Sequence, residues 1–214
     1  MEPLITLTST VIPLLRDDVN TDAIIPAAFM RSLATNPTDG LFAAWRFLED
    51  GSFDPDFVLN DPRYRYGQIL LAGENFGCGS SRENAVWALS GFGIRCVIAK
   101  GFSDIFCENA YKNGMLPVRL APTDHALLVS IAISSPLQLT VDVVQTRLLF
   151  ADHTVEFDLD ERRKATLLSG ADEITQTLTM SEQIEAFRSL HRQRFPWLYS
   201  SIDVQIKPTT TASR

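Results

Sequence analysis

Three side chains that can do chemistry stand together directly after a glycine-rich stretch of this sequence. Ser80, Arg82 and Glu83 bring a hydroxyl, a guanidinium and a carboxylate together, and Gly77 and Gly79 precede them. Glycine adopts positive φ angles and lets a ligand approach main-chain N–H groups closely. The planar guanidinium of arginine can hold a carboxylate through two parallel hydrogen bonds. The pattern therefore predicts an anion site, with a carboxylate as the first choice of ligand.

A strand and a helix are the local elements that would position these side chains. The apolar run at 69–72 predicts a buried strand, which ends at Gly73. Ser80 and Glu83 have the S-x-x-E spacing of a capping box, so the helix is expected to open at Ser80. The free N–H groups and the dipole at a helix N-terminus favour negative charge, which supports the same anion site.

A purely structural interpretation explains the same residues without a ligand. Ser80 would then be only the helix N-cap, Glu83 its reciprocal partner, and Arg82 a solvated residue of the first turn. Local pattern alone leaves both interpretations open. The sequence lacks the P-loop pattern G-x-x-x-x-G-K-[ST], the dinucleotide pattern G-x-G-x-x-G and the nucleophile pattern G-x-S-x-G. Nucleotide binding is therefore disfavoured.

The composition is that of an acidic globular protein. With 214 residues, 45% of them hydrophobic, the chain can bury one sizeable core. A net charge of −7 without any run of Lys or Arg argues against a nucleic-acid partner. The sequence begins without a signal-peptide pattern, and its apolar runs are too short to span a membrane. We expect a soluble, cytoplasmic protein without a membrane partner.

The cysteines and histidines offer little for catalysis or metal binding. Cys78, Cys96 and Cys107 form no C-x-x-C pair, so disulfides are not expected. Cys78 precedes the predicted helix, but a nucleophilic cysteine needs a histidine base, and no histidine is near it in sequence. We interpret Cys78 as a small loop residue and predict no metal site in this chain alone. Surface or capping positions are expected for all three histidines: His125, His153 and His191.

Periodicity elsewhere predicts an α/β fold with parallel strand–helix units in the middle third of the chain. Further strands are expected at 4–15, 96–99 and 116–120, with helices at 41–48, 103–112 and 123–134. Alternating stretches at 138–144, 147–151 and 154–159 predict antiparallel strands. A short helix or turn is expected at 172–178, a surface helix at 181–195 and a frayed tail at 207–214.

Polar residues near the N-terminus have the alternating spacing that opens a calcium loop. Asp18, Asn20 and Asp22 fit its first positions, but Ala23 and Phe29 replace the required glycine and glutamate. Calcium binding is therefore not expected. We interpret these polar side chains as turn caps or as residues that face a cleft.

Three segments carry a resemblance to a known family. They are DDVNTDAIIPAAF at 17–29, LAGENFGCGSSRENAVWAL at 71–89 and VIAKGFSDIFCENAYKNGMLPV at 97–118. Together they resemble the small subunits of 3-isopropylmalate dehydratase, which carry the swivelling domain of the aconitase superfamily as a separate chain. The resemblance spans about residues 5–200. It implies a swivelling β/β/α domain with a mixed sheet over residues 1–206, including a C-terminal helical segment, and a disordered tail at 207–214.

The resemblance implies a hydro-lyase that acts only with a large subunit. Such an enzyme dehydrates 2-isopropylmalate to 2-isopropylmaleate and rehydrates it to 3-isopropylmalate, in leucine biosynthesis. The family's 4Fe-4S cluster sits on the large subunit, and this chain's three scattered cysteines agree with that placement. The remaining hypotheses are a related hydro-lyase acting on another 2-alkylmalate, dimethylmalate or homoaconitate, and a carboxylate-binding module without catalysis.

The resemblance also assigns roles to individual residues. Ser80 matches the serine that removes the carbon-bound proton, and Arg82 matches the arginine that holds a substrate carboxylate. Ser81 and Gly79 lie beside them as substrate-binding residues, and Asp22 matches an aspartate at the edge of the active site. Substrate identity is a weaker implication, because the loop 31–40 falls in the family's substrate-recognition segment and matches no motif.

The chain departs from the family pattern within the predicted helix. Asn84 and Val86 stand where relatives have histidine and proline. These positions lie behind the motif, so the departures concern packing more than chemistry.

Overall fold

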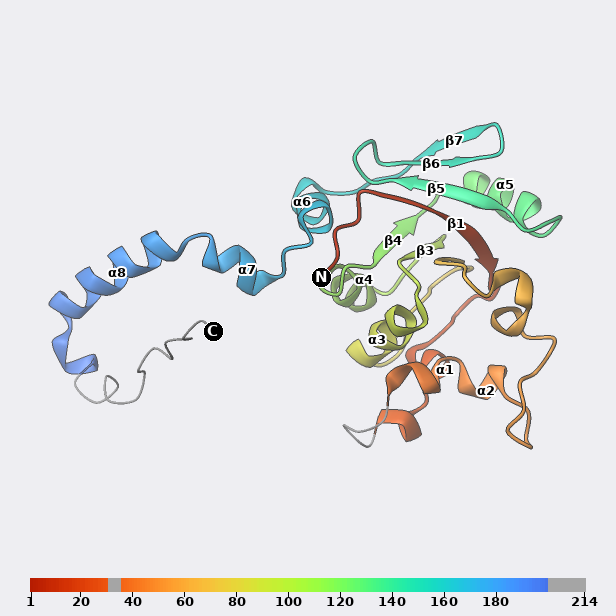
Figure 1. The fold of residues 1–214 in the computed structure, drawn as a ribbon, viewed down its shortest axis with the longest axis horizontal. Helices are drawn as coiled ribbons and strands as arrows, with labels where there is room; N and C mark the ends of the chain where they lie inside the picture. Colours follow the sequence, from red (N-terminus) through yellow and green to blue (C-terminus); the bar gives the residue numbers. More distant parts are fainter. Residues whose placement is uncertain (31–35, 200–214) are drawn as a thin grey trace, which may run out of the picture. The chain divides into compact units, whose positions relative to one another are not determined.

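A mixed sheet of seven strands organises the part of the chain that the structure describes, residues 1–30 and 36–199 of this computed structural model (Figure 1). The strand order is β4-β3-β2-β1-β5-β6-β7. The strands are β1 (Thr6–Pro13), β2 (Ile69–Leu71), β3 (Cys96–Ala99), β4 (Leu116–Arg119), β5 (Gln138–Asp142), β6 (Arg147–Phe150) and β7 (His153–Glu156). Strands β1 to β4 pair in parallel, and β1, β5, β6 and β7 pair antiparallel. The predicted α/β class with parallel units in the middle third is confirmed.

The helices fall into two compact units, Met1–Asp172 and Glu173–Arg214. The first unit contains α1 (Thr21–Ile24), α2 (Ala43–Arg46), α3 (Glu83–Phe92), α4 (Asp104–Lys112), α5 (Pro122–Ala132) and α6 (Glu161–Ser169). Helices α7 (Glu173–Leu178) and α8 (Ser181–Arg194) belong to the second unit. One domain over residues 1–206 stays a prediction, and the predicted tail at 207–214 lies outside the described residues.

Short 3₁₀ turns connect the longer elements, and three of them, η2, η4 and η5, begin with a proline. They are η1 (Ala27–Met30), η2 (Pro37–Gly40), η3 (Val58–Asn60), η4 (Pro62–Tyr64) and η5 (Pro196–Leu198). The helix predicted over 41–48 is reduced to the four residues of α2.

The central parallel strands β2 and β3 are buried on both faces, as their uninterrupted apolar sequences require. Successive side chains of a strand point to opposite faces, so Leu70 packs into the core cluster that includes Val86 and Leu89 of α3. Ile69 and Leu71 belong to the opposite cluster, which reaches β5 to β7 and helices α5 and α6. Figure 1 shows α3 and α4 on one side of these strands and α5 on the other. The sheet thus fixes the carboxyl ends of β1 and β2, and the loops that carry the predicted site residues follow these two strands.

Two local predictions differ from the structure. Helix α3 begins at Glu83 with Arg82 as N-cap, and no side chain caps it, so the capping box opening at Ser80 is wrong. Gly79 has φ +86° and keeps the chain outside the helical region at that point. Helix α6 was not predicted, although Asp160 caps its first turn by accepting a hydrogen bond from the Arg163 N–H at 3.0 Å.

Gly77 should tolerate alanine worse than Gly51 does. Both have positive φ, +74° and +82°, so alanine strains the backbone at either position by about 1–2 kcal/mol. At Gly77 the added Cβ would also lie 2.4 Å from Cγ of Phe106, which adds about 1–3 kcal/mol of overpacking, whereas nothing lies within 4 Å at Gly51. Urea unfolding of Gly77→Ala should therefore show the larger loss of stability. Equal losses in the two variants would contradict this packing.

Candidate functional site

Two segments far apart in sequence continue side by side beyond the ends of β1 and β2. The Gly73 N–H donates to the carbonyl of Arg16 at 3.0 Å, and the Asp18 N–H donates to the carbonyl of Glu74 at 2.9 Å. The parallel pairing of the two strands therefore extends into their following loops. We call the pair of segments 16–22 and 73–82 the paired loops.

The pairing continues up to the residues predicted to form the site. The Gly77 N–H donates to the Val19 carbonyl at 2.8 Å, and the Thr21 N–H donates to the Cys78 carbonyl at 3.0 Å. The Thr21 hydroxyl donates to the carbonyl of Ser80 at 2.8 Å. The structure thus brings the motif around Asp22 against the motif around Ser80.

The first contact between the paired loops leaves room only for glycine. A Cβ at Gly73 would lie 2.1 Å from Oδ1 of Asp17 and 2.7 Å from the carbonyl oxygen of Arg16. The Asp17 carboxylate accepts a hydrogen bond from the Glu74 N–H at 2.5 Å, and its Oδ1 lies 3.5 Å from Nζ of Lys100. The close approach of the two backbones therefore depends on the missing side chain.

Arg82 forms an ion pair with Asp22 across the paired loops. The side chain of Arg82 is 21% exposed and that of Asp22 is 57% exposed, so the guanidinium is held at the surface and is not free in solvent. Gly79, Ser80 and Ser81 are exposed beside this pair. The structure therefore brings together all five predicted site residues on one open face, and the structural interpretation of Ser80 as an N-cap does not hold.

This face lies where α/β proteins commonly bind ligands. It follows the carboxyl end of β2, between its parallel neighbours β1 and β3. Within the described residues, the N–H groups of Gly79, Ser80 and Ser81 donate no hydrogen bond. Together with the N-terminus of α3 and the guanidinium of Arg82, they can stabilise a negatively charged group.

His125 forms a hydrogen bond at the carboxyl end of β2, which the sequence did not predict. His125 is only 6% exposed, so of its two predicted positions, surface or capping, the surface one is wrong. Nε2 lies 2.6 Å from the carbonyl oxygen of Ala72, directly before Gly73. Helix α5 places the imidazole there, where it satisfies the carbonyl of the buried residue Ala72. The predicted surface position of His153 agrees with its exposure on β7.

The three cysteines lie on different elements and do not form a cluster. Cys78 is half-buried in the glycine loop, Cys96 is buried in β3 and Cys107 is half-buried on α4. Burial raises the pKa of the Cys96 thiol, and it raises the pKa of Cys107 to about 11. In residues 1–30 and 36–199, no group of three or more His, Cys, Asp and Glu side chains could hold a metal ion. These residues do not fit an iron–sulfur cluster, which needs several thiolates together.

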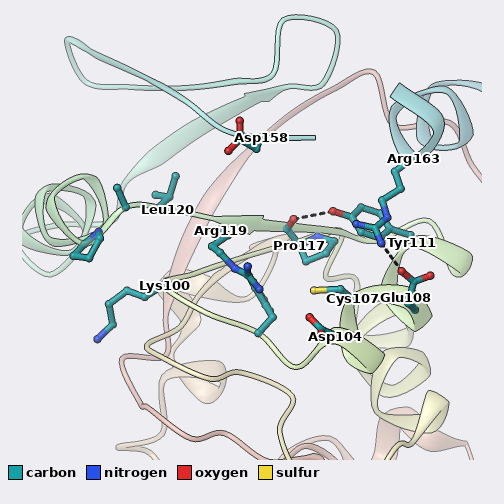
Figure 2. Close-up of a pocket in the computed structure, with 13 residues that line it drawn as sticks. Lys100, Asp104, Cys107, Glu108, Tyr111, Pro117, Arg119, Leu120, Asp158 and Arg163 are labelled. Atoms are coloured by element: carbon teal, nitrogen blue, oxygen red, sulfur yellow. Dashed lines mark hydrogen bonds and ion pairs between the residues drawn. The ribbon is translucent and has the colours of Figure 1, made fainter. Parts of the chain in front are cut away.

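A cleft of about 620 Å³ lies next to the carboxyl ends of β3 and β4 and contains none of the predicted site residues. Figure 2 shows Arg163 in it, beside Tyr111 and Glu108. The guanidinium of Arg163 pairs with Glu108 and lies 4.6 Å from the centre of the Tyr111 ring. Three cations (Lys100, Arg119 and Arg163) and three carboxylates (Asp104, Glu108 and Asp158) line this cleft, so its formal charges balance.

Helices long and apolar enough to cross a membrane do not occur in the part of the chain that the structure describes. This finding covers only those residues.

Comparison with known proteins identifies the family. Residues 1–123 match the model of the aconitase C-terminal domain. The 3-isopropylmalate dehydratase small subunit of Brucella canis is 43% identical over 200 residues, which cover 92% of this chain and 100% of that protein. The protein of the same name from Rhizobium johnstonii is 44% identical over 200 residues, or 92% of this chain and 99% of the relative.

A solved structure agrees with both matches. The crystal structure of 3-isopropylmalate dehydratase from Methanocaldococcus jannaschii superposes with a TM-score of 0.61 at 28% identity, covering 86% of this chain and 99% of that one. The chain therefore belongs to the aconitase C-terminal domain family, and within it to the 3-isopropylmalate dehydratase small subunits.

Removing the charge of Asp17 should change how stability depends on pH. The pKa of Asp17 lies below its ordinary value of 3.8, first because the Glu74 N–H donates to the carboxylate and further because of Lys100. A carboxyl group with a lowered folded-state pKa stabilises the fold above its ordinary pKa and loses that effect as pH falls through the lowered value. Asp17→Asn should therefore be less stable than the parent at neutral pH, and the difference should shrink below pH 3.8. Urea unfolding across this range measures it, and a constant difference would contradict the assignment.

Proposed function

We propose that this chain is the small subunit of a hydro-lyase that isomerises 2-isopropylmalate to 3-isopropylmalate through 2-isopropylmaleate, a step of leucine biosynthesis. The observation that carries the proposal is an identity of 43% along the whole length of a relative that bears this name. The open anion-binding face around Ser80 and Arg82 supports it, because the substrate is a dicarboxylate.

In this proposal Ser80 removes the carbon-bound proton. A free serine hydroxyl is a weak base, so the site must stabilise the alkoxide that does this work. The unengaged N–H groups of the glycine loop, the N-terminus of α3 and the nearby guanidinium of Arg82 all favour negative charge there. Because Ser80 is exposed, its hydroxyl is open to a substrate that arrives from outside the chain.

Arg82 binds a substrate carboxylate, and Asp22 fixes its orientation. The ion pair with Asp22 restricts the guanidinium before substrate arrives, which lowers the entropic cost of binding. A guanidinium has five N–H donors, so donors remain for a carboxylate. Ser81 and Gly79 lie beside it and contribute further hydrogen bonds to the substrate.

The active enzyme needs a large subunit in this proposal. The relatives are named small subunits, and the open face around Ser80 leaves the other side of a substrate uncovered. The 4Fe-4S cluster belongs to the large subunit, where it would take the substrate hydroxyl, since this chain's cysteines lie on separate elements. We place the assembled enzyme in the cytoplasm.

Replacing Ser80 by alanine tests the proposed base. In an anaerobic mixture with the cluster-loaded large subunit, the parent chain should generate alkene absorbance from 2-isopropylmalate. Ser80→Ala should lower kcat by about 10²–10⁴ with little change in KM, because only proton transfer is removed. Ser130→Ala is a matched control, since that exposed hydroxyl donates to the Leu127 carbonyl within α5 and, among the residues the structure describes, to nothing else.

Three results would contradict the proposal in different ways. If Ser80→Ala turns over like the Ser130 control, Ser80 is not the base. If the parent complex dehydrates dimethylmalate or homoaconitate faster than 2-isopropylmalate, the chemistry stands and the substrate is wrong. A chain that binds dicarboxylates alone and assembles with no large subunit would be a binding module instead.

Arg82→Lys should raise KM with a smaller effect on kcat. Lysine keeps the charge but loses the planar pair of donors, so one charged hydrogen bond to the carboxylate is lost. Such a bond contributes about 1.5–3 kcal/mol, which corresponds to roughly a 10- to 100-fold rise in KM. Arg95→Lys is the control, because Arg95 pairs with Glu2 at the surface. An unchanged KM in Arg82→Lys would place the substrate carboxylate elsewhere.

A further inference from the structure

We propose that Thr21 is a positioning residue that turns the N–H groups of Gly79 and Ser81 toward the substrate. The inference rests on the proposed function and adds to it the residue that orients the anion-binding amides. Thr21 itself is only 3% exposed, so it does not touch a ligand and acts through the loop.

Thr21 holds the glycine loop on both sides of Gly79. Its main-chain N–H donates to the carbonyl of Cys78 at 3.0 Å. Its hydroxyl donates to the carbonyl of Ser80 at 2.8 Å. One buried residue therefore fixes the direction of two carbonyl groups that flank the residue with φ +86°.

The direction of each carbonyl decides the direction of the next N–H. In a planar trans peptide the C=O and the N–H point in opposite directions. Because the Cys78 carbonyl points at Thr21, the Gly79 N–H points away from it. The same holds for the Ser80 carbonyl and the Ser81 N–H. Both amides are thus directed away from the buried side, and neither donates a hydrogen bond within the described residues.

Thr21 is itself held firmly enough to impose this geometry. It is the first residue of α1, where Asn20 caps the helix by accepting a hydrogen bond from the Ala23 N–H at 2.8 Å. The Thr21 carbonyl accepts from the Ile25 N–H at 2.9 Å. The hydroxyl therefore approaches the Ser80 carbonyl from a fixed backbone, and its loss would free the peptide between Ser80 and Ser81 to rotate.

A purely structural role for the same hydroxyl makes a different prediction. A buried hydroxyl that only stabilises the fold would change the free energy of unfolding without changing turnover. Ser9 provides that comparison within this chain. It is 7% exposed, and its hydroxyl accepts a hydrogen bond from the Gln68 N–H at 2.9 Å, before β2 begins.

The kinetic test uses Thr21→Val, Thr21→Ser and Ser9→Ala in the complex with the large subunit. Valine has nearly the same shape as threonine but lacks the hydroxyl, so kcat should fall by about 100-fold while KM changes less. Thr21→Ser keeps the hydroxyl and should keep most of the turnover. Ser9→Ala should lose stability and keep the parent kcat. A parent-like kcat in Thr21→Val, or equal losses in Thr21→Val and Thr21→Ser, would overturn the inference.

A second measurement on the full-length chain alone separates this inference from the proposed function. Amide NMR should show the Gly79 and Ser81 signals shifted in Thr21→Val, restored in Thr21→Ser and unmoved in Ser9→Ala. If these signals do not move in Thr21→Val, Thr21 does not orient the amides, whatever the enzyme does. If they move but the parent complex is inactive on 2-isopropylmalate, the geometry stands and the proposed function fails.

Discussion

The hydrogen bonds between the paired loops are the interaction on which the rest of the site depends. Strands β1 and β2 pair in parallel, and the segments that follow them stay hydrogen-bonded to each other from Gly73 to Ser80, the last of these bonds coming from the Thr21 hydroxyl. This contact requires a glycine at Gly73, where a side chain would meet Asp17 and Arg16. It also carries Asp22 to the guanidinium of Arg82. Without it, the two motifs would be unrelated surface loops.

The paired loops also explain why a surface-exposed serine can take part in chemistry. Their buried side uses the carbonyl groups of Cys78 and Ser80, so the opposite side presents N–H groups and the serine hydroxyl. Preorganised donors of this kind stabilise charge without reorganising during the reaction. The face they form is open, which suits the proposal that this chain supplies one half of an active site and the large subunit the other half.

The sequence predicted those features that have a local cause. The continuous apolar run at Cys96–Ala99 predicted its strand. The types and spacing of Ser80 and Arg82 predicted an anion site, while the roles of the five site residues come from the family resemblance and stay a prediction. The capping box at Ser80 was a wrong prediction because Gly79 has φ +86° there and the Ser80 carbonyl accepts a hydrogen bond from Thr21, which lies far from Ser80 in sequence. The burial of His125 has the same kind of cause, since its partner is Ala72. Helix α6 had a visible local signal in Asp160 and was overlooked.

The most direct test of the account is a structure of the complete two-subunit enzyme with a substrate analogue bound. The account predicts Ser80 Oγ within about 3 Å of the atom that carries the transferred proton, or of the group that replaces it. It also predicts Arg82 on a carboxylate of the analogue, with the Asp22 pair retained. An analogue held by the large subunit alone, with Ser80 and Arg82 outside hydrogen-bond reach of it, would contradict the central claim.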